Sequence, residues 1–384
     1  MISRTRGLLG VLFSVALLVG SGILIRVVLS RCVEDLRDHR WTWAYMGCVL
    51  VFAFASCALL TRVMIWLSFR LNVLDIPNAR KIHAEPMPLL GGVAVFLSFL
   101  LTLVFAFHLR TPVVGMLLGG TLILVMGVMD DARGLSAKAR LVGQVLAAAM
   151  VMHYGVVMEF IPGELGGRVM EVILTVLWIV GITNALNFLD GMDGLATGLA
   201  AISLASFLCI GIETHQTDFG FITAALLGSC LGFLVFNFKP ASIFLGDSGS
   251  TFLGFSLASL AVMGTYSERD EISALFIPLL ILGIIIYDVI FITFYRIKIG
   301  AVRNFHEWLE YTGKDHLHHR LSHLGLSERA TVLFIYLLSI FMSIGAIVLV
   351  VKAEVDRFLV IIMALIVYIL ISVLMELGKK RSEW

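Results

Sequence analysis

The sequence contains little charge and little cysteine. Charged residues make up 14% of the 384-residue chain and hydrophobic residues 59%, whereas soluble globular domains carry about 25% charged residues. The composition therefore excludes an ordinary soluble domain. The five cysteines are scattered, mostly within apolar runs, which argues against a disulfide framework and indicates small buried side chains. The sequence also lacks a basic tail, zinc-ligand spacing and an arginine-rich strip, so no nucleic-acid partner is expected.

What the chain has in abundance is apolar runs long enough to cross a membrane. A run of about 18 residues or more crosses roughly 30 Å of hydrocarbon as a helix. The predicted fold class is therefore all-α, a polytopic integral membrane protein with about 12 transmembrane helices. We predict spans at 7–29, 42–67, 90–109, 113–129, 140–157, 170–187, 194–212, 219–237, 249–265, 272–295, 330–352 and 356–377.

The first span follows a basic start and is similar to a secretory signal. No cleavage site of the A-x-A type follows it, so we expect an uncleaved helix. Residues 1–40 are then an extra N-terminal transmembrane helix with an outer loop. Residues 41–384 form one polytopic domain without a low-complexity linker or a convincing internal repeat.

Lysine and arginine are distributed unevenly between the two sets of alternate loops. The set that includes the N-terminus holds twice as many as the other set, and the positive-inside rule then places both termini in the cytoplasm. The polar segments 75–92, 130–140, 184–194, 237–250 and 315–321 all fall on that side. One face of the membrane is thus predicted to carry the chemistry.

A pair of carboxylates, Asp130 and Asp131, closes the fourth span. Carboxylates beside hydrocarbon are costly, so a chain that keeps them there is expected to use them. Adjacent carboxylates repel one another, so one can keep a raised pKa and act as a base, or a cation can hold both ionised. A solvated pair at the membrane interface is the alternative.

A second acidic segment repeats an Asn or Asp at every third position. Asn184, Asn187, Asp190 and Asp193 fall roughly on one side of a helix end, and Gly194 allows the backbone to break there. A helix cap followed by a turn is the alternative. Because a cap needs one such residue, four of them favour a functional site.

The third segment, 237–250, combines a helix stop with a glycine-rich helix start. Pro240 ends the incoming helix, and a Gly-Asp-Ser-Gly-Ser turn around Asp247 opens the next one. The free N–H groups at that end, with Ser248 and Ser250, suit phosphate oxygens or help to orient a metal-bound Asp247. A simple N-cap is the alternative. Clustered Asp and Asn oxygens with little sulfur nearby are the ligands that Mg²⁺ prefers.

A histidine-rich segment lies in the longest predicted loop. His316, His318, His319 and Arg320 combine imidazoles with a guanidinium, and such groups suit a diphosphate. Zinc binding is less favoured, because no cysteine or second spaced ligand set accompanies the histidines. A solvated loop is the remaining alternative.

Two further polar features lie elsewhere along the chain. Arg80, Lys81 and His83 stand in a proline-stiffened stretch, where they suit a lipid phosphate or serve as an ordinary positive-inside anchor. Asp288 lies within the tenth predicted span. For Asp288 we expect structural pairing rather than catalysis.

Together and in this order, these motifs resemble those of the polyprenyl-phosphate N-acetylhexosamine-1-phosphate transferases of glycosyltransferase family 4. The likeness extends from about Asp75 to about Leu321. The Arg-Lys-x-His-x-x-Pro-x-Pro-x-x-Gly-Gly segment at 80–92 and the His-x-His-His-Arg form at 316–320 are similar to the undecaprenyl-phosphate N-acetylglucosamine-1-phosphate transferase branch. The muramoyl-pentapeptide branch typically carries other forms of both segments.

The resemblance implies an eleven-helix core, preceded here by one extra span, and a phosphotransferase that depends on Mg²⁺ or Mn²⁺. Undecaprenyl phosphate would attack the β-phosphorus of a UDP-N-acetylhexosamine, with UDP-N-acetylglucosamine as the expected donor. The products would be UMP and the lipid-linked sugar diphosphate that starts an envelope polysaccharide. The site would face the cytoplasm at the bacterial inner membrane, and a homodimer is one expected assembly.

By motif match, the resemblance also implies roles for single residues. Asp247 would be the principal metal ligand, with Asn187 close to the metal. Asp130 or Asp131 would be the base that deprotonates the lipid phosphate, or the nucleophile of a two-step reaction. The other implied roles are the nucleotide site (Asp190, Asp193), uracil stacking (Phe244), phosphate contact (Asn237), diphosphate contact (Arg140) and the sugar-phosphate grip (His316, His318, His319, Arg320).

The segment before the histidines departs from the family. Residues 303–315 lack the usual Ser-Pro-Phe and Pro-Asp-Arg pattern. Because this loop bears on the choice of sugar, another UDP-N-acetylhexosamine or UDP-MurNAc-pentapeptide is the alternative donor. A secondary transporter is the alternative of another class, but it would place ionisable groups near the bilayer midplane, often with inverted repeats. Here the acids lie at span ends on one face. A non-catalytic membrane scaffold is a third alternative, and the density of Asp in glycine-containing turns argues against it.

Overall fold

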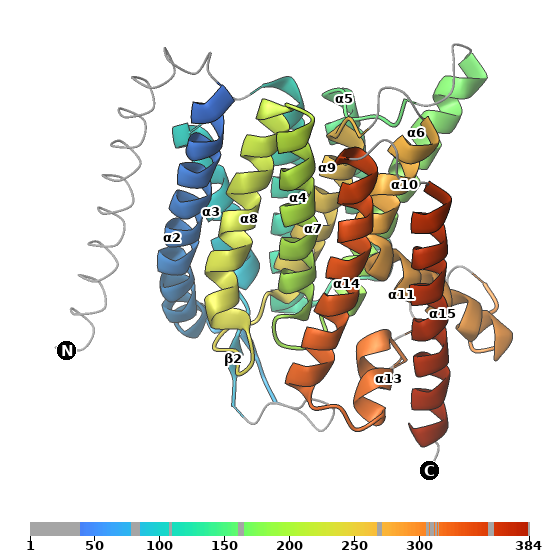
Figure 1. Cartoon of the computed structure of the whole chain (residues 1–384). Helices are drawn as coiled ribbons and strands as arrows, with labels where there is room; N and C mark the ends of the chain where they lie inside the picture. Colours follow the sequence, from blue (N-terminus) through green and yellow to red (C-terminus); the bar gives the residue numbers. More distant parts are fainter. Residues whose placement is uncertain are drawn as a thin grey trace, which may run out of the picture.

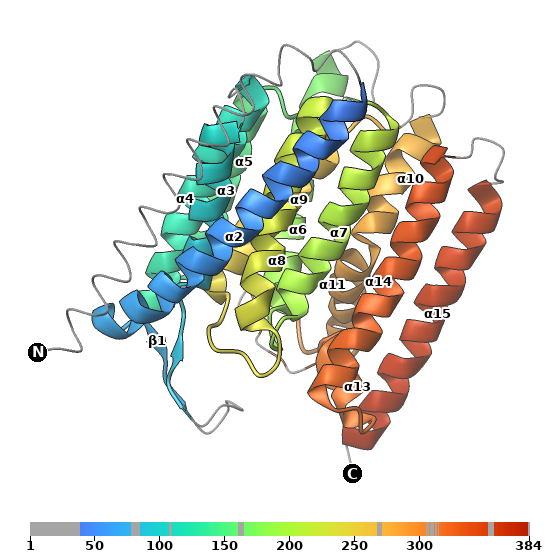
Figure 2. The ribbon, with the colours of Figure 1, turned by 60° about the vertical axis from the view of Figure 1, so that its left-hand side comes forward.

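The fold is a bundle of helices with one two-stranded hairpin (Figures 1 and 2). The computed structural model describes residues 39–77, 85–106, 110–159, 165–266, 271–304, 307, 311, 313, 315–351 and 357–382. The predicted all-α, polytopic fold class is confirmed for this part of the chain. The extra span at 7–29 lies outside the described residues, and so do Arg80, Lys81 and His83.

Most of the long helices that follow one another along the chain run in opposite directions, whereas α10 leads on into α11 (Figures 1 and 2). Their bounds are α2 (His39–Leu71), α3 (Gly91–Ala106), α4 (Thr111–Arg133), α5 (Ala137–His153), α6 (Leu165–Leu189), α7 (Leu195–Glu213), α8 (Thr217–Asn237), α9 (Gly246–Met263), α10 (Glu271–Ile281), α11 (Gly283–Lys298), α13 (Leu317–His323), α14 (Glu328–Val351) and α15 (Arg357–Ser382). Among the described residues, seven helices are long and apolar enough to cross a membrane, or eight with the bent pair α10–α11. Every predicted span from 42–67 onward overlaps a helix.

The prediction of one continuous helix over 272–295 is wrong. The segment divides at Leu282 into α10 and α11, whose axes are bent by 80°. Pro278 lies inside α10, and a proline there removes one intrahelical hydrogen bond. The N–H of Leu282 bonds back to the carbonyl of Pro278 at 3.0 Å, just before α11 begins. The bend brings Asp288 and Arg296 of α11 next to α13.

Several polar segments gather at one end of the bundle, the end at which α15 finishes (Figure 1). The hairpin β1 (Leu74–Asp75) and β2 (Met87–Pro88) and the short helix α13 lie there. The carboxyl ends of α4, α6 and α8 and the amino end of α9 line a cavity together with the hairpin. The chain therefore collects its predicted motifs in one place.

Glycines let the start of α9 approach its neighbours closely. A Cβ on Gly127 of α4 would lie 2.3 Å from the Cα of Ser248. A Cβ on Gly92 of α3 would lie 2.2 Å from the backbone N of Gly249. These separations are far below a normal carbon contact, so the backbones of α3, α4 and α9 touch directly and fix where α9 begins.

Candidate active site

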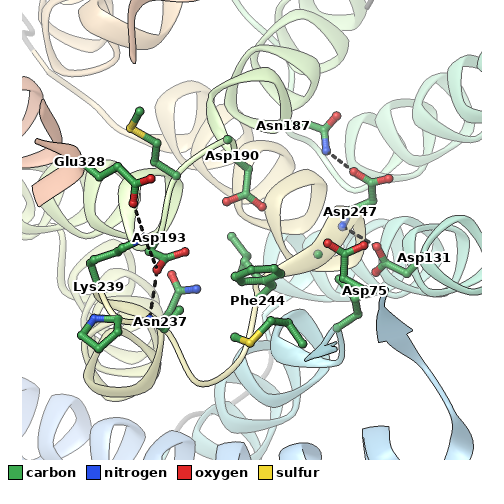
Figure 3. Close-up of a pocket in the computed structure, with 18 of the residues that line it drawn as sticks. Asp75, Asp131, Asn187, Asp190, Asp193, Asn237, Lys239, Phe244, Asp247 and Glu328 are labelled. Carbon is green, nitrogen blue, oxygen red and sulfur yellow. Dashed lines mark hydrogen bonds and ion pairs between the residues drawn. The ribbon is translucent and has the colours of Figure 1, made fainter. Parts of the chain in front are cut away.

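A cavity of about 660 Å³ opens at the polar end of the bundle. Its acidic lining residues are Asp75, Asp130, Asp131, Asp190, Asp193, Asp247 and Glu328. Its basic lining residues are Lys239 and His319. Figure 3 shows the ring of Phe244 between a group of side chains around Asp247 and a group around Lys239. Acids therefore outnumber bases in the cavity wall.

Asp131 caps the start of α9 with both of its oxygens. Its Oδ1 accepts a hydrogen bond from the backbone N–H of Asp247 (2.8 Å), and its Oδ2 accepts one from Ser248 (3.1 Å). Gly246 lies before them at φ +74°, and a Cβ there would be 2.7 Å from Asp131 Oδ2. Unpaired N–H groups at a helix start favour a negative charge, so Asp131 fixes the amino end of α9.

Asp247 lies in the first turn of α9 and lines the cavity. Its Oδ1 accepts a hydrogen bond from Asn187 Nδ2 (2.7 Å), and the same nitrogen donates to Ser250 Oγ (2.8 Å). Asn187 belongs to the last turn of α6. The structure thus places the two residues of the predicted metal site side by side (Figure 3).

Asp130 differs from its neighbour Asp131. Its Oδ1 accepts a hydrogen bond from the N–H of Leu135 (2.6 Å), which closes the turn after α4. Its Oδ2 is buried, has no hydrogen-bond partner among the described residues and lies 3.3 Å from Arg140 Nη1. The carboxylate also adjoins that of Asp247. Asp130 therefore keeps one oxygen without a hydrogen bond, whereas Asp131 does not.

Asp190 lies in the turn between α6 and α7. Burial, followed by the charges of Asp247, Asp131 and Asp193, raises the pKa of Asp190 well above its ordinary value. Like charges that share a site disfavour ionisation. The carboxylates of the cavity thus carry more negative charge than the nearby protein groups neutralise.

The opposite side of the cavity is organised around Lys239. Its ammonium pairs with Glu328, the first residue of α14, and lies 3.5 Å from Asp193. Burial alone would lower the pKa of Lys239, but Glu328 and Asp193 outweigh it and the pKa is raised. Asp193 also accepts a hydrogen bond from the N–H of Ala241 (3.1 Å). These contacts join the turn after α6, the loop after α8 and the start of α14.

Asn237 and Phe244 bound the loop between α8 and α9. The buried amide of Asn237 accepts from Thr197 (3.0 Å) and donates to the carbonyl of Ile243 (3.0 Å), so it braces this loop. The N–H of Phe244 donates to the carbonyl of Pro88 in β2 (2.9 Å). The hairpin therefore helps to hold Phe244 at the cavity.

The predicted histidines lie at the start of α13, and His319 lines the cavity. His318 is buried, and a Cβ on Gly191 would lie 2.3 Å from its Nε2. Burial, followed by the charges of His319 and His316, lowers the pKa of His318 well below its ordinary value. The imidazole of His318 is therefore neutral and packs against the turn that carries Asp190.

Three of the four predicted sugar-phosphate residues, His316, His318 and Arg320, do not line the cavity. The guanidinium of Arg320 donates to the carbonyls of Asp315 (2.7 Å) and Met375 (3.1 Å), which joins α13 to α15. His316 Nδ1 lies 2.6 Å from Asp288 Oδ2. Both side chains hold α13 in place. The expected pairing of Asp288 is present, with a histidine as its partner.

The residues present fit a hard cation such as Mg²⁺. Asp247 and Asn187, whose side chains lie next to one another, would hold it. Mg²⁺ commonly keeps several waters and takes one or two carboxylates together with substrate phosphates. The uncompensated negative charge around Asp190 also favours a cation here.

Sequence reasoning missed three residues that line the cavity, Asp75, Lys239 and Glu328. Lys239 stands inside the 237–250 motif, between a predicted site residue and the helix-stopping proline. Glu328 lies two residues before the predicted span 330–352, on the same face as the acidic motifs. An acidic residue beside a predicted span on that face was the feature from which Glu328 could have been predicted.

Comparisons with known proteins agree with these features. Residues 113–265 match the profile of glycosyl transferase family 4. The chain is 36% identical over 307 residues to the probable undecaprenyl-phosphate N-acetylglucosaminyl 1-phosphate transferase of Bacillus subtilis strain 168, covering 78% of this chain and 83% of that one. It is 34% identical over 316 residues to the decaprenyl-phosphate N-acetylglucosaminephosphotransferase of Mycobacterium leprae, covering 73% and 77%.

A muramoyl relative matches a shorter stretch. The phospho-N-acetylmuramoyl-pentapeptide-transferase of Levilactobacillus brevis is 35% identical over 218 residues, which covers 50% of this chain and 65% of that one. The relatives named for N-acetylglucosamine transfer thus match over more of the chain. The chain belongs to the polyprenyl-phosphate N-acetylhexosamine-1-phosphate transferases of glycosyl transferase family 4, in the N-acetylglucosamine branch, and is a multi-pass membrane enzyme.

Proposed function

We propose that the protein transfers N-acetylglucosamine-1-phosphate from UDP-N-acetylglucosamine to undecaprenyl phosphate at the cytoplasmic face of the bacterial inner membrane, releasing UMP. The observation that carries this proposal is the acidic cavity at one end of an apolar bundle. A lipid within the membrane and a water-soluble nucleotide sugar can meet only at such a boundary. Relatives named for N-acetylglucosamine phosphate transfer to polyprenyl phosphates support the transferred group and the acceptor.

In the proposed reaction Asp130 is the base. Its Oδ2, which has no hydrogen-bond partner among the described residues, accepts the proton of the lipid phosphate. A lipid phosphate oxygen then forms a bond to the β-phosphorus of the donor, and the bond from that phosphorus to the bridging oxygen breaks. UMP leaves with the bridging oxygen. Arg140, 3.3 Å from Asp130, is placed to bind the arriving phosphate.

The other cavity residues bind and orient the substrates. Asp247 and Asn187 would hold Mg²⁺ or Mn²⁺, which supplies charge neutralisation of the diphosphate when it is bound. Asp131 has both oxygens engaged by α9, so its task is to position Asp247. Phe244 offers an aromatic face for the uracil ring.

The remaining predicted contacts follow the two sides of the cavity. Asp190 and Asp193 border the nucleotide, and His319 contacts the sugar phosphate from the start of α13. Arg80, Lys81 and His83, outside the described residues, remain predicted contacts of the lipid phosphate.

UMP release by the purified protein tests the proposal. The protein is incubated with Mg²⁺, undecaprenyl phosphate and one UDP-sugar at a time. We expect UDP-N-acetylglucosamine to support turnover and Asp247→Ala to lower the rate by about 100-fold or more, since single electrostatic groups in preorganised sites contribute this much. Asp218→Ala is the matched control, because Asp218 is also an acid in the first turn of a helix, paired with Arg110.

Three outcomes decide between the candidates. No UMP from any donor, or an undiminished rate in Asp247→Ala, would refute the proposed reaction. Turnover with UDP-MurNAc-pentapeptide alone would favour the second candidate, to which the similarity of the muramoyl relative points. Loss of activity in Asp218→Ala would show that the assay reports folding rather than the site.

A further inference from the structure

Asp288 is a fully buried carboxylate in α11 that does not line the cavity. It makes two short contacts with the first residues of the α13 region. His316 Nδ1 lies 2.6 Å from its Oδ2, and the N–H of Leu317 donates to its Oδ1 at 2.7 Å. A buried carboxylate is stable only when hydrogen bonds and opposite charge compensate it. Asp288 therefore holds the start of α13 against α11.

The surroundings of His316 select one tautomer. Because Asp288 accepts at Nδ1, that nitrogen carries the proton. Nε2 lies 3.4 Å from Nη2 of Arg296, a donor, so Nε2 is the acceptor. Arg296 is in turn paired with Asp315 at 2.6 and 2.8 Å. His316 thus donates from Nδ1 to Asp288 and accepts at Nε2 from Arg296, which also donates to Asp315. For Asp288 to accept from both His316 and Leu317, its carboxylate must be charged.

Helix α13 connects the contacts of Asp288 with the cavity. His319 lines the cavity, and His318 packs against Gly191. Neither ring nitrogen of His318 has a hydrogen-bond partner among the described residues, so this ring does not anchor the helix by hydrogen bonds. The anchors are Asp288 at its start and Arg320, which binds the carbonyl of Met375 in α15.

We propose that Asp288 is a positioning residue for sugar-1-phosphate transfer, which acts by holding α13 so that His319 stays at the cavity wall and His318 stays packed against Gly191. The inference rests on the proposed function, because it assumes that the nucleotide sugar binds beside His319. It does not make Asp288 a contact of the substrate.

The first test measures the anchor without reference to activity. Hydrogen exchange of the peptide that covers residues 317–323 is compared in detergent for the wild-type protein, Asp288→Ala and Tyr287→Phe. Tyr287 is the neighbouring residue of α11, and its hydroxyl bonds Ser372 of α15 instead of α13. We expect Asp288→Ala to speed exchange in this peptide by about 10-fold, since it removes a hydrogen bond to a charged group, and Tyr287→Phe to leave it unchanged.

The second test measures transfer in the isosteric variant Asp288→Asn. The amide keeps one acceptor oxygen, but its NH2 group then faces either the N–H of Leu317 or Nδ1 of His316. The first arrangement sets donor against donor, and the second moves the proton of His316 to Nε2, against the donor Arg296 Nη2. We expect kcat/KM for UDP-N-acetylglucosamine to fall by about 10- to 100-fold, as for other residues that orient a functional imidazole. The KM for undecaprenyl phosphate and the rate of Tyr287→Phe should stay within about twofold of wild type, because neither depends on α13.

The outcomes separate this inference from the proposed function. Faster exchange in Asp288→Ala together with the donor-specific loss in Asp288→Asn supports positioning. Unchanged exchange overturns the anchor, and unchanged kinetics in an active wild-type background overturns the role in transfer. Equal losses toward both substrates would indicate general damage and would also overturn it. A wild-type protein that releases no UMP with any donor refutes the proposed function itself.

Discussion

Gly246 is a position where a single added methyl group should disturb the site directly. Its φ is +74°, and a Cβ there would lie 2.7 Å from Asp131 Oδ2 and 2.8 Å from the carbonyl oxygen of Leu89. Gly300, in the turn after α11, provides a matched control, because its φ is +71° and nothing lies within 4 Å of a Cβ there. Gly246→Ala and Gly300→Ala therefore both place alanine at a positive φ and differ in the contact.

The expected difference between the two variants follows from that contact. Alanine at positive φ costs about 1–2 kcal/mol at either site. Forcing a methyl group against a backbone carbonyl and a carboxylate adds roughly 1–3 kcal/mol, at Gly246 alone. At about 2.1 cal/mol/K per residue, the unfolding entropy of a chain of this length is near 0.8 kcal/mol/K. The melting temperature of Gly246→Ala should thus lie about 1–4 °C below that of Gly300→Ala.

Activity should separate the variants more strongly than stability does. Relief of the clash moves Asp131 or the start of α9, and a displacement of about 1 Å can lower a rate by about 100-fold. We expect UMP release to fall by about that factor in Gly246→Ala and to stay within threefold, roughly, in Gly300→Ala. Thermal melts and UMP release of both purified variants provide the measurement. If the two variants match in melting temperature and in rate, the contact with Asp131 does not position α9 and the reasoning is wrong.

Three further predictions concern the cavity wall. Gly191→Ala should displace the buried ring of His318 and raise the KM for the nucleotide sugar by about 10-fold, as misplaced binding groups do. Phe244→Leu should raise the same KM by roughly 10-fold, since stacking on a base contributes about 1–3 kcal/mol. In EDTA, the melting temperature should fall as pH rises above about 4, because the pKa of Asp190 is raised by burial and by its acidic neighbours. An acid whose pKa is higher in the folded state than in the unfolded state stabilises the fold at pH values below the unfolded-state pKa. This stabilisation is lost as pH rises through the folded-state pKa. Bound Mg²⁺ should reduce the fall in melting temperature, because it offsets the negative charge.

Each of these predictions has a contrary result. An unchanged nucleotide-sugar KM in Gly191→Ala would show that His318 does not support the donor site. Equal effects of Phe244→Leu on donor and lipid KM would argue against a uracil-stacking role. A pH dependence in EDTA that persists unchanged in Asp190→Asn would assign the slope to another group.

The positions of most helices could be predicted from the sequence, because the thickness of the hydrocarbon core sets the length of an apolar run that spans it. Each predicted span from 42–67 onward coincides with helix, and the acidic motifs lie where spans end. The bend at Leu282 was not foreseen, although Pro278 stands nearby. Hydropathy depends only on the residue types in a segment. It therefore does not distinguish a straight apolar helix from two apolar helices that meet at an angle.

The division of work between Asp130 and Asp131 needed coordinates. In sequence the two residues are equivalent adjacent carboxylates. In the fold, α9 engages both oxygens of Asp131, while Asp130 retains one oxygen without a hydrogen bond. The roles of the histidine segment could not be predicted from the sequence either. His316 and Arg320 belong to a motif that suggests substrate contact, yet their partners on α11 and α15 lie far away in the sequence.

The direct backbone contacts around α9 suggest how enzymes of this architecture diversify. The carboxylate side of the cavity rests on α3, α4 and α9, whose main chains touch at Gly92 and Gly127, so this half resists change. Another part of the cavity wall, His319, is supplied by the short helix between α11 and α14, which Asp288 and Arg320 attach to the bundle. On the proposed function, we expect a chimera that exchanges this connecting segment and preserves both attachment residues to change the preference for the donor sugar and to retain phosphate transfer.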